Sequence, residues 1–141
     1  MKFFFDNCLA PSFARALNIF GETQGYPQIT HLRDKFEPHT KDQTWIRACW
    51  IRALGEEGDW VIVSGDPRIS RGRHEREAWL ESGLTAFFMA KGWMNQRLWD
   101  QAWNLVRWWP VIVDQAERIR PGAGFLVPLK GTKLEQLVIS R

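Results

Sequence analysis

Three stretches of this chain are apolar at nearly every consecutive position, and this feature constrains the fold more than any other. They lie at residues 2–6 (KFFFD), 59–66 (DWVIVSGD) and 85–92 (TAFFMAKG). A strand with one face in water alternates apolar and polar residues, so continuous runs indicate strands that are covered on both faces. Such strands are typical of parallel sheets with helices on both sides.

Helical patterns separate these apolar runs. Apolar residues recur at helical spacing in residues 8–21, 44–58, 74–84 and 95–119, and Pro110 is expected to kink or split the last helix. Short strands are expected near 28–32 and at 122–129, while 133–141 fits a strand or a short helix. The alternation predicts one α/β domain over residues 1–141, with a mostly parallel sheet of four to five strands. The expected strand order is 2-1-3-4, with the fifth strand at the edge.

Composition and charge exclude few functions. The chain has 141 residues and is 45% hydrophobic, which suits one globular domain. Its net charge of +3 is mild and by itself does not indicate nucleic-acid binding. No apolar stretch approaches the roughly 18–20 residues of a membrane span, and the N-terminal run is too short for a signal peptide. The default expectation is a cytoplasmic protein without a membrane partner. Cys8 and Cys49 form no metal-binding pattern and are expected to be buried free thiols.

Carboxylates follow two of the apolar runs at the points where the strands end. Ligands of open α/β sheets bind beyond the carboxyl ends of strands where the strand order reverses. We therefore expect Asp6 and Asp66 to face each other between the first and third strands. Asp42 would join them if its helix begins at the same edge. Adjacent carboxylates repel one another, and a hard divalent cation such as Mg²⁺ or Mn²⁺ would relieve that repulsion.

Each of these carboxylates also has a simpler explanation. Asp42 is well placed to cap its helix, and Asp6 or Asn7 could cap the helix that follows the first strand. Asp66 could form an Asx turn, and Asp34 fits a solvated loop charge near the same edge. Capping and metal binding thus both stay open for each residue. Their coincidence at one sheet edge favours the metal site.

Arginines crowd the segment that leaves Asp66. They are Arg68, Arg71, Arg73 and Arg76. Cations near the start of a helix are unfavourable unless they meet an anion, and arginine binds phosphate bidentately. The segment is therefore expected to contact a phosphodiester substrate. The alternative is a basic solvated loop that Glu75 and Glu77 partly balance.

Tryptophans crowd the last helical pattern. Its apolar residues cover so wide an arc that most of them are expected to be core. Any exposed part, around Trp103, Arg107 and Trp108, is a candidate interface with another protein.

Four motifs, read in order, resemble a known family. KFFFDNCLAPSFARAL, HLRDKF, KDQTWI and DWVIVSGDPRI together resemble the PIN-like domain family, in particular the compact ribonucleases of VapC-type toxins. The resemblance covers residues 1 to about 130. It implies a Rossmann-like PIN domain, an acidic Mg²⁺ site and endoribonuclease activity. Asp6, Asp42 and Asp66 match the acidic positions, while Pro67 and Arg68 stand where related sequences often place a further acid.

The resemblance also implies roles and partners. Asn7 would orient a ligand or a water, Asp34 is the spare candidate for a fourth acid, and Arg68, Arg71 and Arg73 would hold the RNA backbone. An antitoxin protein is the expected partner, and a homodimer is a further expectation. Two other classes stay open. One is a phospho-acceptor receiver domain, and the other is a binding module whose acids are only helix caps.

Overall fold

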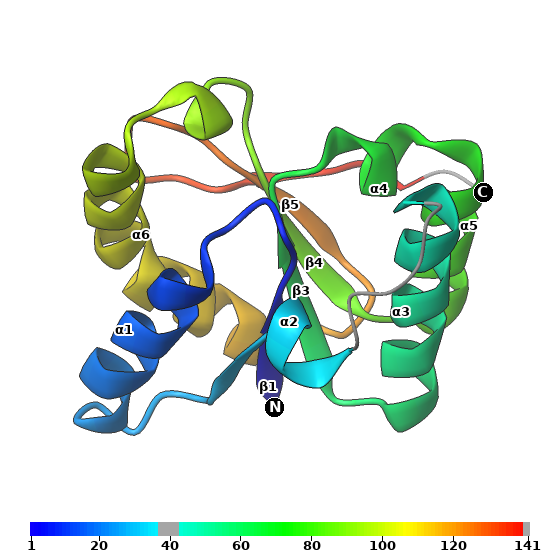
Figure 1. Cartoon of the computed structure of the whole chain (residues 1–141), viewed down its shortest axis with the longest axis horizontal. Helices are drawn as coiled ribbons and strands as arrows, with labels where there is room; N and C mark the ends of the chain where they lie inside the picture. Colours follow the sequence, from blue (N-terminus) through cyan, green and yellow to red (C-terminus); the bar gives the residue numbers. More distant parts are fainter. Residues whose placement is uncertain (37–42, 140–141) are drawn as a thin grey trace.

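A six-stranded sheet separates two layers of helices in the computed structural model, which describes residues 1–36 and 43–139 (Figure 1). Helices α1 (Pro11–Glu22) and α6 (Leu98–Arg118) lie on one face of the sheet. Helices α3 (Gln43–Glu57), α4 (Pro67–Arg71) and α5 (Arg73–Ser82) lie on the other. This arrangement confirms the expected α/β fold with helices on both faces of the sheet.

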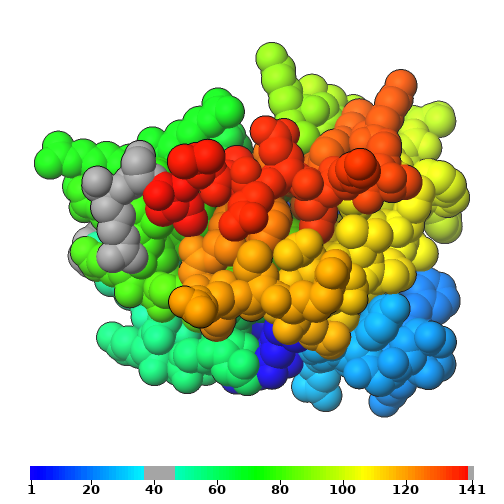
Figure 2. Space-filling model, turned by 180° about the vertical axis from the view of Figure 1, so that it is seen from behind, coloured from blue at the N-terminus to red at the C-terminus, as the bar shows by residue number. Residues whose placement is uncertain are grey.

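The sheet confirms the predicted strand order and adds one strand. Its strands are β1 (Lys2–Phe5), β2 (Ile29–His31), β3 (Trp60–Ser64), β4 (Thr85–Met89), β5 (Gly124–Val127) and β6 (Glu135–Gln136). Within the described ranges they follow the order β2-β1-β3-β4-β5-β6, and all neighbours are parallel except β5 and β6. The sixth strand is the short antiparallel β6, formed by the last segment, for which a strand or a short helix was expected. The fifth strand was expected at the edge, and this was wrong because β6 covers β5. Seen from behind, the chain after β5 runs along the surface between α6 and α5 (Figure 2).

Two short helices were not expected from the sequence. Helix α2 (Leu32–Lys35) follows β2 directly, and α4 replaces the loop that was expected after β3. Asp66 is the N-cap of α4, and Pro67 occupies its first position, where a missing N–H costs no hydrogen bond. The 3₁₀ turn η1 (Trp93–Asn95) precedes α6. Helix α6 is not split at Pro110. Pro110 lies on the exposed side of the helix, where water can donate the hydrogen bond that the N–H missing from proline would have donated.

The three consecutive phenylalanines support both layers. Successive residues of a strand point to opposite faces, so Phe3 and Phe5 join the core under α1 and α6, while Phe4 joins the core under α3 and α5. The ring of Trp109 packs edge-on against Phe3 and Phe5, with centroids 4.7 and 5.4 Å away. Strand β1 is therefore held from both sides up to the residue before Asp6.

The tryptophans of α6 divide between core and surface. Trp109 is buried, as expected, and Trp108 is buried too, although it was named in the candidate interface, whereas Trp99 and Trp103 are 84% and 66% exposed. Arg107 donates to the Gly131 carbonyl over 2.6 Å, so the exposed apolar surface lies toward the start of α6 rather than around Trp108.

The structure also tests two smaller expectations from the sequence. Cys49 is exposed on α3, so the prediction of a buried thiol was wrong there. Among the described residues, no helix combines the length and the apolar character needed to cross a bilayer.

Candidate functional site

Asp6 and Ser64 lie side by side at the carboxyl edge of the sheet. The parallel register pairs Phe5 of β1 with Val63 of β3. The residues that follow them, Asp6 and Ser64, are therefore neighbours. The Ser64 hydroxyl donates a hydrogen bond to Asp6 Oδ2, and the Cys8 amide donates to Oδ1 over 3.0 Å. Asp6 is thus held at the point where β1 ends.

Ser64 also links Asp6 to Asp66. Its Oγ accepts a hydrogen bond of 2.9 Å from the Asp66 amide. The Arg68 amide and Nε both approach Asp66 Oδ1, at 2.9 and 3.2 Å. One hydroxyl therefore connects the carboxylate of Asp6 to the backbone amide of Asp66, at the edge where the sequence placed both residues. The Asx turn expected for Asp66 is confirmed by the bond from the Arg68 amide, and the same bond makes Asp66 the N-cap of α4. Ala10, rather than Asp6 or Asn7, is the N-cap of α1.

Asp6 is a buried carboxyl group that pairs with none of the cationic side chains in residues 1–36 and 43–139. It is 4% exposed, and among the described residues no cationic side chain forms an ion pair with it. Burial raises the pKa of Asp6 most, the hydrogen bonds from Ser64 and Cys8 oppose this rise, and the charge of Asp66 adds to it, so that the pKa lies at about 6. A cation next to Asp6 would favour its charged form.

Asp66 shares a second guanidinium with Glu75. Arg47 Nη1 lies 3.0 Å from Asp66 Oδ2, and Arg47 Nε lies 3.7 Å from Glu75 Oε1. The side chains of Arg47, Asp66 and Glu75 are only 11%, 7% and 5% exposed. A buried ionic cluster on α3, α4 and α5 therefore adjoins the pair of carboxylates.

Arg47 and Glu75 were missed as site residues in the sequence. The sequence names Glu75 only in the alternative of a basic solvated loop, whose charge it would partly balance. Helical spacing carried a signal for Glu75, because Ala78 and Trp79 follow it at i+3 and i+4 and are buried. Charged residues on a buried helix face need partners, so this spacing could have singled out Glu75.

His31 holds the loop that carries Asp6. This side chain is 1% exposed, and the Arg33 amide donates to its Nδ1 over 3.1 Å. The proton is therefore on Nε2, which donates to the Leu9 carbonyl over 2.7 Å. Burial lowers the pKa of His31, so a neutral ring fixes the segment between β1 and α1.

The other predicted acidic and amide residues lie apart from this pair. Asn7 is exposed in the turn after β1. Asp34 on α2 is half exposed and pairs with Arg15 at 3.7 Å, which fits the solvated charge expected for it. Asp42 lies outside the described residues.

The predicted arginines lie on the two helices that follow Asp66. Arg68 is 59% exposed while its Nε stays near Asp66, and Arg73 is 85% exposed with its Nε 3.9 Å from Glu77. Arg71 is exposed as well. Arg76 instead donates to the Ser70 carbonyl over 2.8 Å and ties α5 to α4. Three of the four arginines therefore present charge to solvent beside Asp66.

The donor atoms at this edge suit a hard divalent cation. Asp6 and Asp66 offer carboxylate oxygens, and Mg²⁺ is commonly held by one or two carboxylates together with water and substrate phosphates. In the described ranges no three acidic, histidine or cysteine side chains form a metal cluster, so these residues supply two carboxylates. The buried and unpaired Asp6 is the observation that fits a cation, because a metal would neutralise it.

Removing the Ser64 hydroxyl is expected to destabilise the protein. In Ser64→Ala the buried Asp66 amide loses its acceptor and Asp6 loses a donor, so we expect a loss of about 1–3 kcal/mol. Urea unfolding at neutral pH measures this. Ser70→Ala is the control, because the Ser70 hydroxyl bonds only an exposed carbonyl, that of Pro67. Equal stability of the two variants would show that the bridge through Ser64 is unimportant.

Comparison with known proteins gives one match. A family model described as a PIN-like domain matches residues 1–91. The match contains β1 to β4 with Asp6, Asp66 and Glu75, and it ends before α6. Neither curated proteins nor solved structures provide a match.

Proposed function

The chain belongs to the PIN-like domain family, and on that premise we propose that it is a Mg²⁺-dependent endoribonuclease. The family has a nuclease-type fold, which the parallel sheet and its flanking helices display. The observation that carries the proposal is that buried Asp6 and Asp66 lie at the carboxyl edge of β1 and β3, where Ser64 connects the Asp6 carboxylate to the Asp66 backbone amide.

In this proposal each site residue has a separate task. Asp6 and Asp66 would hold Mg²⁺ or Mn²⁺, with Asp42 as the proposed third carboxylate and Asn7 orienting a water. The bound cation supplies Lewis acidity and a water of lowered pKa for attack on the phosphodiester. Ser64 would hold the Asp6 carboxylate against the backbone of Asp66, so that less reorganisation is needed when substrate binds.

Arginines beside Asp66 would bind the RNA backbone. Arg68, Arg71 and Arg73 are exposed on α4 and α5, and α4 begins directly at Asp66. Their guanidinium groups match phosphate oxygens in charge and geometry. An RNA held by these arginines would pass the carboxylate pair.

A toxin role would require a protein that restrains the nuclease. We propose an antitoxin protein as that partner. The support is an exposed apolar surface on α6, formed by Leu98, Trp99, Trp103 and Val106. Large exposed aromatic residues of this kind are typical of protein interfaces. A homodimer through the same helix is the competing use of this surface, and sedimentation of the isolated chain distinguishes the two.

Cleavage of RNA tests the proposed activity. The purified chain is incubated with single-stranded RNA in Mg²⁺ or in EDTA, beside Asp66→Asn and the control Asp114→Asn. Asp114 is an exposed carboxylate on α6 that pairs with Arg118. We expect cleavage only with Mg²⁺ and a loss of at least about a hundredfold in Asp66→Asn alone, the scale for removing one preorganised charge-stabilising group. Equal cleavage by all three proteins would point to contamination and reject the proposal.

A further inference from the structure

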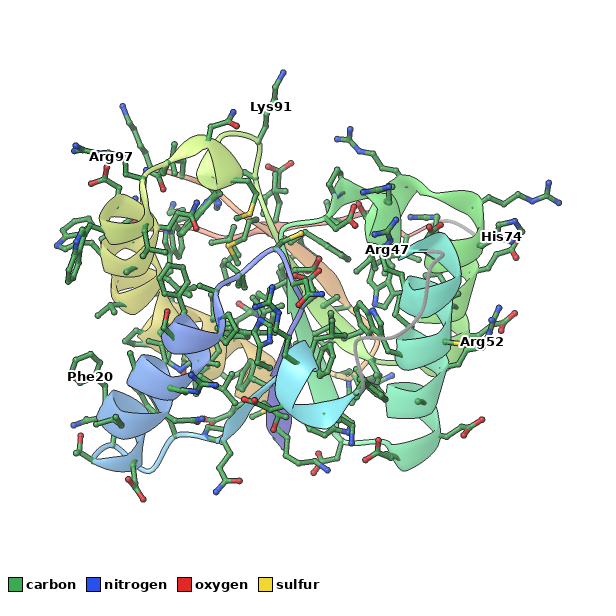
Figure 3. All side chains as sticks on the ribbon, viewed as in Figure 1. Phe20, Arg47, Arg52, His74, Lys91 and Arg97 are labelled. Atoms are coloured by element: carbon green, nitrogen blue, oxygen red, sulfur yellow. The ribbon has the colours of Figure 1, made fainter. Side chains whose placement is uncertain are left out.

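Arg47 places a positive charge beside Asp66, where a bound metal cation would also place one. Its guanidinium is 3.0 Å from Asp66 and 3.7 Å from Glu75, and all three side chains are almost entirely buried. Buried charges are stable only when they are paired, so Arg47 is the counter-charge of both carboxylates. In Figure 3, Arg47 and Arg52 lie on different sides of α3.

The guanidinium of Arg47 is incompletely satisfied. In the part of the chain that the structure describes, its buried Nε and Nη2 have no hydrogen-bond partner. Arginine binds a carboxylate most strongly through two parallel hydrogen bonds to one group. Arg47 is instead spread between two carboxylates and makes that bidentate pair with neither. Its hold on Asp66 is therefore weaker than that of a bidentate ion pair.

Glu75 is fixed in its position by the junction of α4 and α5. A Cβ atom at Gly72 would lie 2.6 Å from Glu75 Oε2 and 2.6 Å from the Arg68 carbonyl. The absent side chain at Gly72 thus leaves the space that the Glu75 carboxylate occupies. Glu75 can then share Arg47 with Asp66 without a change in the helices.

We propose that Arg47 competes with the divalent cation for Asp66 and thereby sets the metal affinity of the site. The proposal rests on the proposed function, because it takes Asp66 as a metal ligand. A unit positive charge a few ångströms from a cation site opposes binding of a second cation. A cation held by the Asp66 carboxylate would share that group with the Arg47 guanidinium and would be repelled by its charge. Removing the charge of Arg47 would therefore tighten metal binding, because the carboxylates of Asp66 and Glu75 would lose their counter-charge.

Titration with Mn²⁺ tests this competition without measuring activity. Free Mn²⁺ is followed by electron paramagnetic resonance at pH 7.5 and low salt, in the wild type, Arg47→Gln, Arg47→Lys and Arg52→Gln. Arg52 is an exposed cation on the same helix, so it controls for net charge. We expect Arg47→Gln to bind Mn²⁺ about tenfold more tightly or better, with Arg47→Lys and Arg52→Gln close to wild type.

A purely structural role of Arg47 predicts the opposite result. If Arg47 only orients Asp66, Arg47→Gln binds Mn²⁺ equally or more weakly, and the proposal is overturned. Should Arg47→Gln fail to fold, the variant Arg47→Gln with Glu75→Gln removes one charge of each sign, and it too must bind Mn²⁺ more tightly than wild type.

The outcome separates this proposal from the proposed nuclease activity. Mg²⁺-dependent RNA cleavage by the wild type, with no gain of Mn²⁺ affinity in Arg47→Gln, rejects the role of Arg47 alone. Tighter Mn²⁺ binding in Arg47→Gln, with no cleavage by any protein, rejects the nuclease alone. Absence of Mn²⁺ binding in every protein rejects both.

Discussion

Asp6→Asn is expected to lose RNA cleavage by at least about a hundredfold and yet to be more stable than wild type at neutral pH without metal. Asparagine cannot supply the negative charge that a cation requires, although it keeps an oxygen for the Ser64 hydroxyl. The same substitution removes a buried charge that has no paired cation among the described residues. Loss of activity and gain of stability would then come from one carboxylate.

The pH dependence of stability follows from the pKa of Asp6. Burial raises that pKa from 3.8 to about 6, so the folded protein binds the proton more tightly than the unfolded chain does. The contribution of Asp6 to the free energy of unfolding is therefore fully present below pH 4 and is lost as the pH rises through 6. At about 1.4 kcal/mol for each pKa unit, the metal-free wild type loses up to about 3 kcal/mol over this range.

Urea unfolding of Asp6→Asn and wild type in EDTA measures this effect. The free energy of unfolding of wild type relative to that of Asp6→Asn is expected to fall between pH 4 and pH 7, because the lowered pKa values of Glu57 and Asp59 act equally in both proteins. Asp34→Asn, which alters an exposed carboxylate, is the control. Parallel pH profiles for Asp6→Asn and wild type would contradict the assignment of a buried, unpaired Asp6.

Trp109→Ala is expected to cause the largest loss of stability among these substitutions. Trp109 is buried and contacts Phe3 and Phe5, so its removal leaves a cavity under β1. Replacing a buried tryptophan with alanine costs about 3–5 kcal/mol. The support of the strand that ends in Asp6 would be lost with it.

Trp99→Ala is the matched control on the same helix. Trp99 is 84% exposed, so its replacement is expected to change the free energy of unfolding by less than about 0.5 kcal/mol. Chemical unfolding compares both variants with wild type. Equal losses in the two variants would show that Trp109 does not carry the packing described for β1.

The sheet and the carboxylate pair could be predicted because they depend on local patterns. Continuous apolar runs indicated strands covered on both faces, and the parallel arrangement brought their carboxyl ends to one edge. Asp6 and Asp66 follow directly from that arrangement. The segment that forms β6 could be predicted only as a strand or a short helix, because Glu135 and Gln136 are exposed and carry little strand signal.

The ionic cluster could not be derived in the same way. Helical spacing shows that Glu75 faces the core, but it does not show which cation lies opposite. Arg47 is on α3, 28 residues earlier in the chain, and it meets Glu75 only because α3 packs against α5. Ser64 was likewise missed, because its bridging role depends on the register between β1 and β3.

Mn²⁺ binding by wild type, Asp6→Asn and Asp34→Asn tests the central claim most directly. A site formed by Asp6 and Asp66 predicts that wild type and Asp34→Asn bind Mn²⁺ with equal affinity. Asp6→Asn should bind at least about tenfold more weakly, because one carboxylate ligand is lost. Equal binding by Asp6→Asn and wild type, or no binding by wild type at millimolar Mn²⁺, would contradict a metal site at the end of β1.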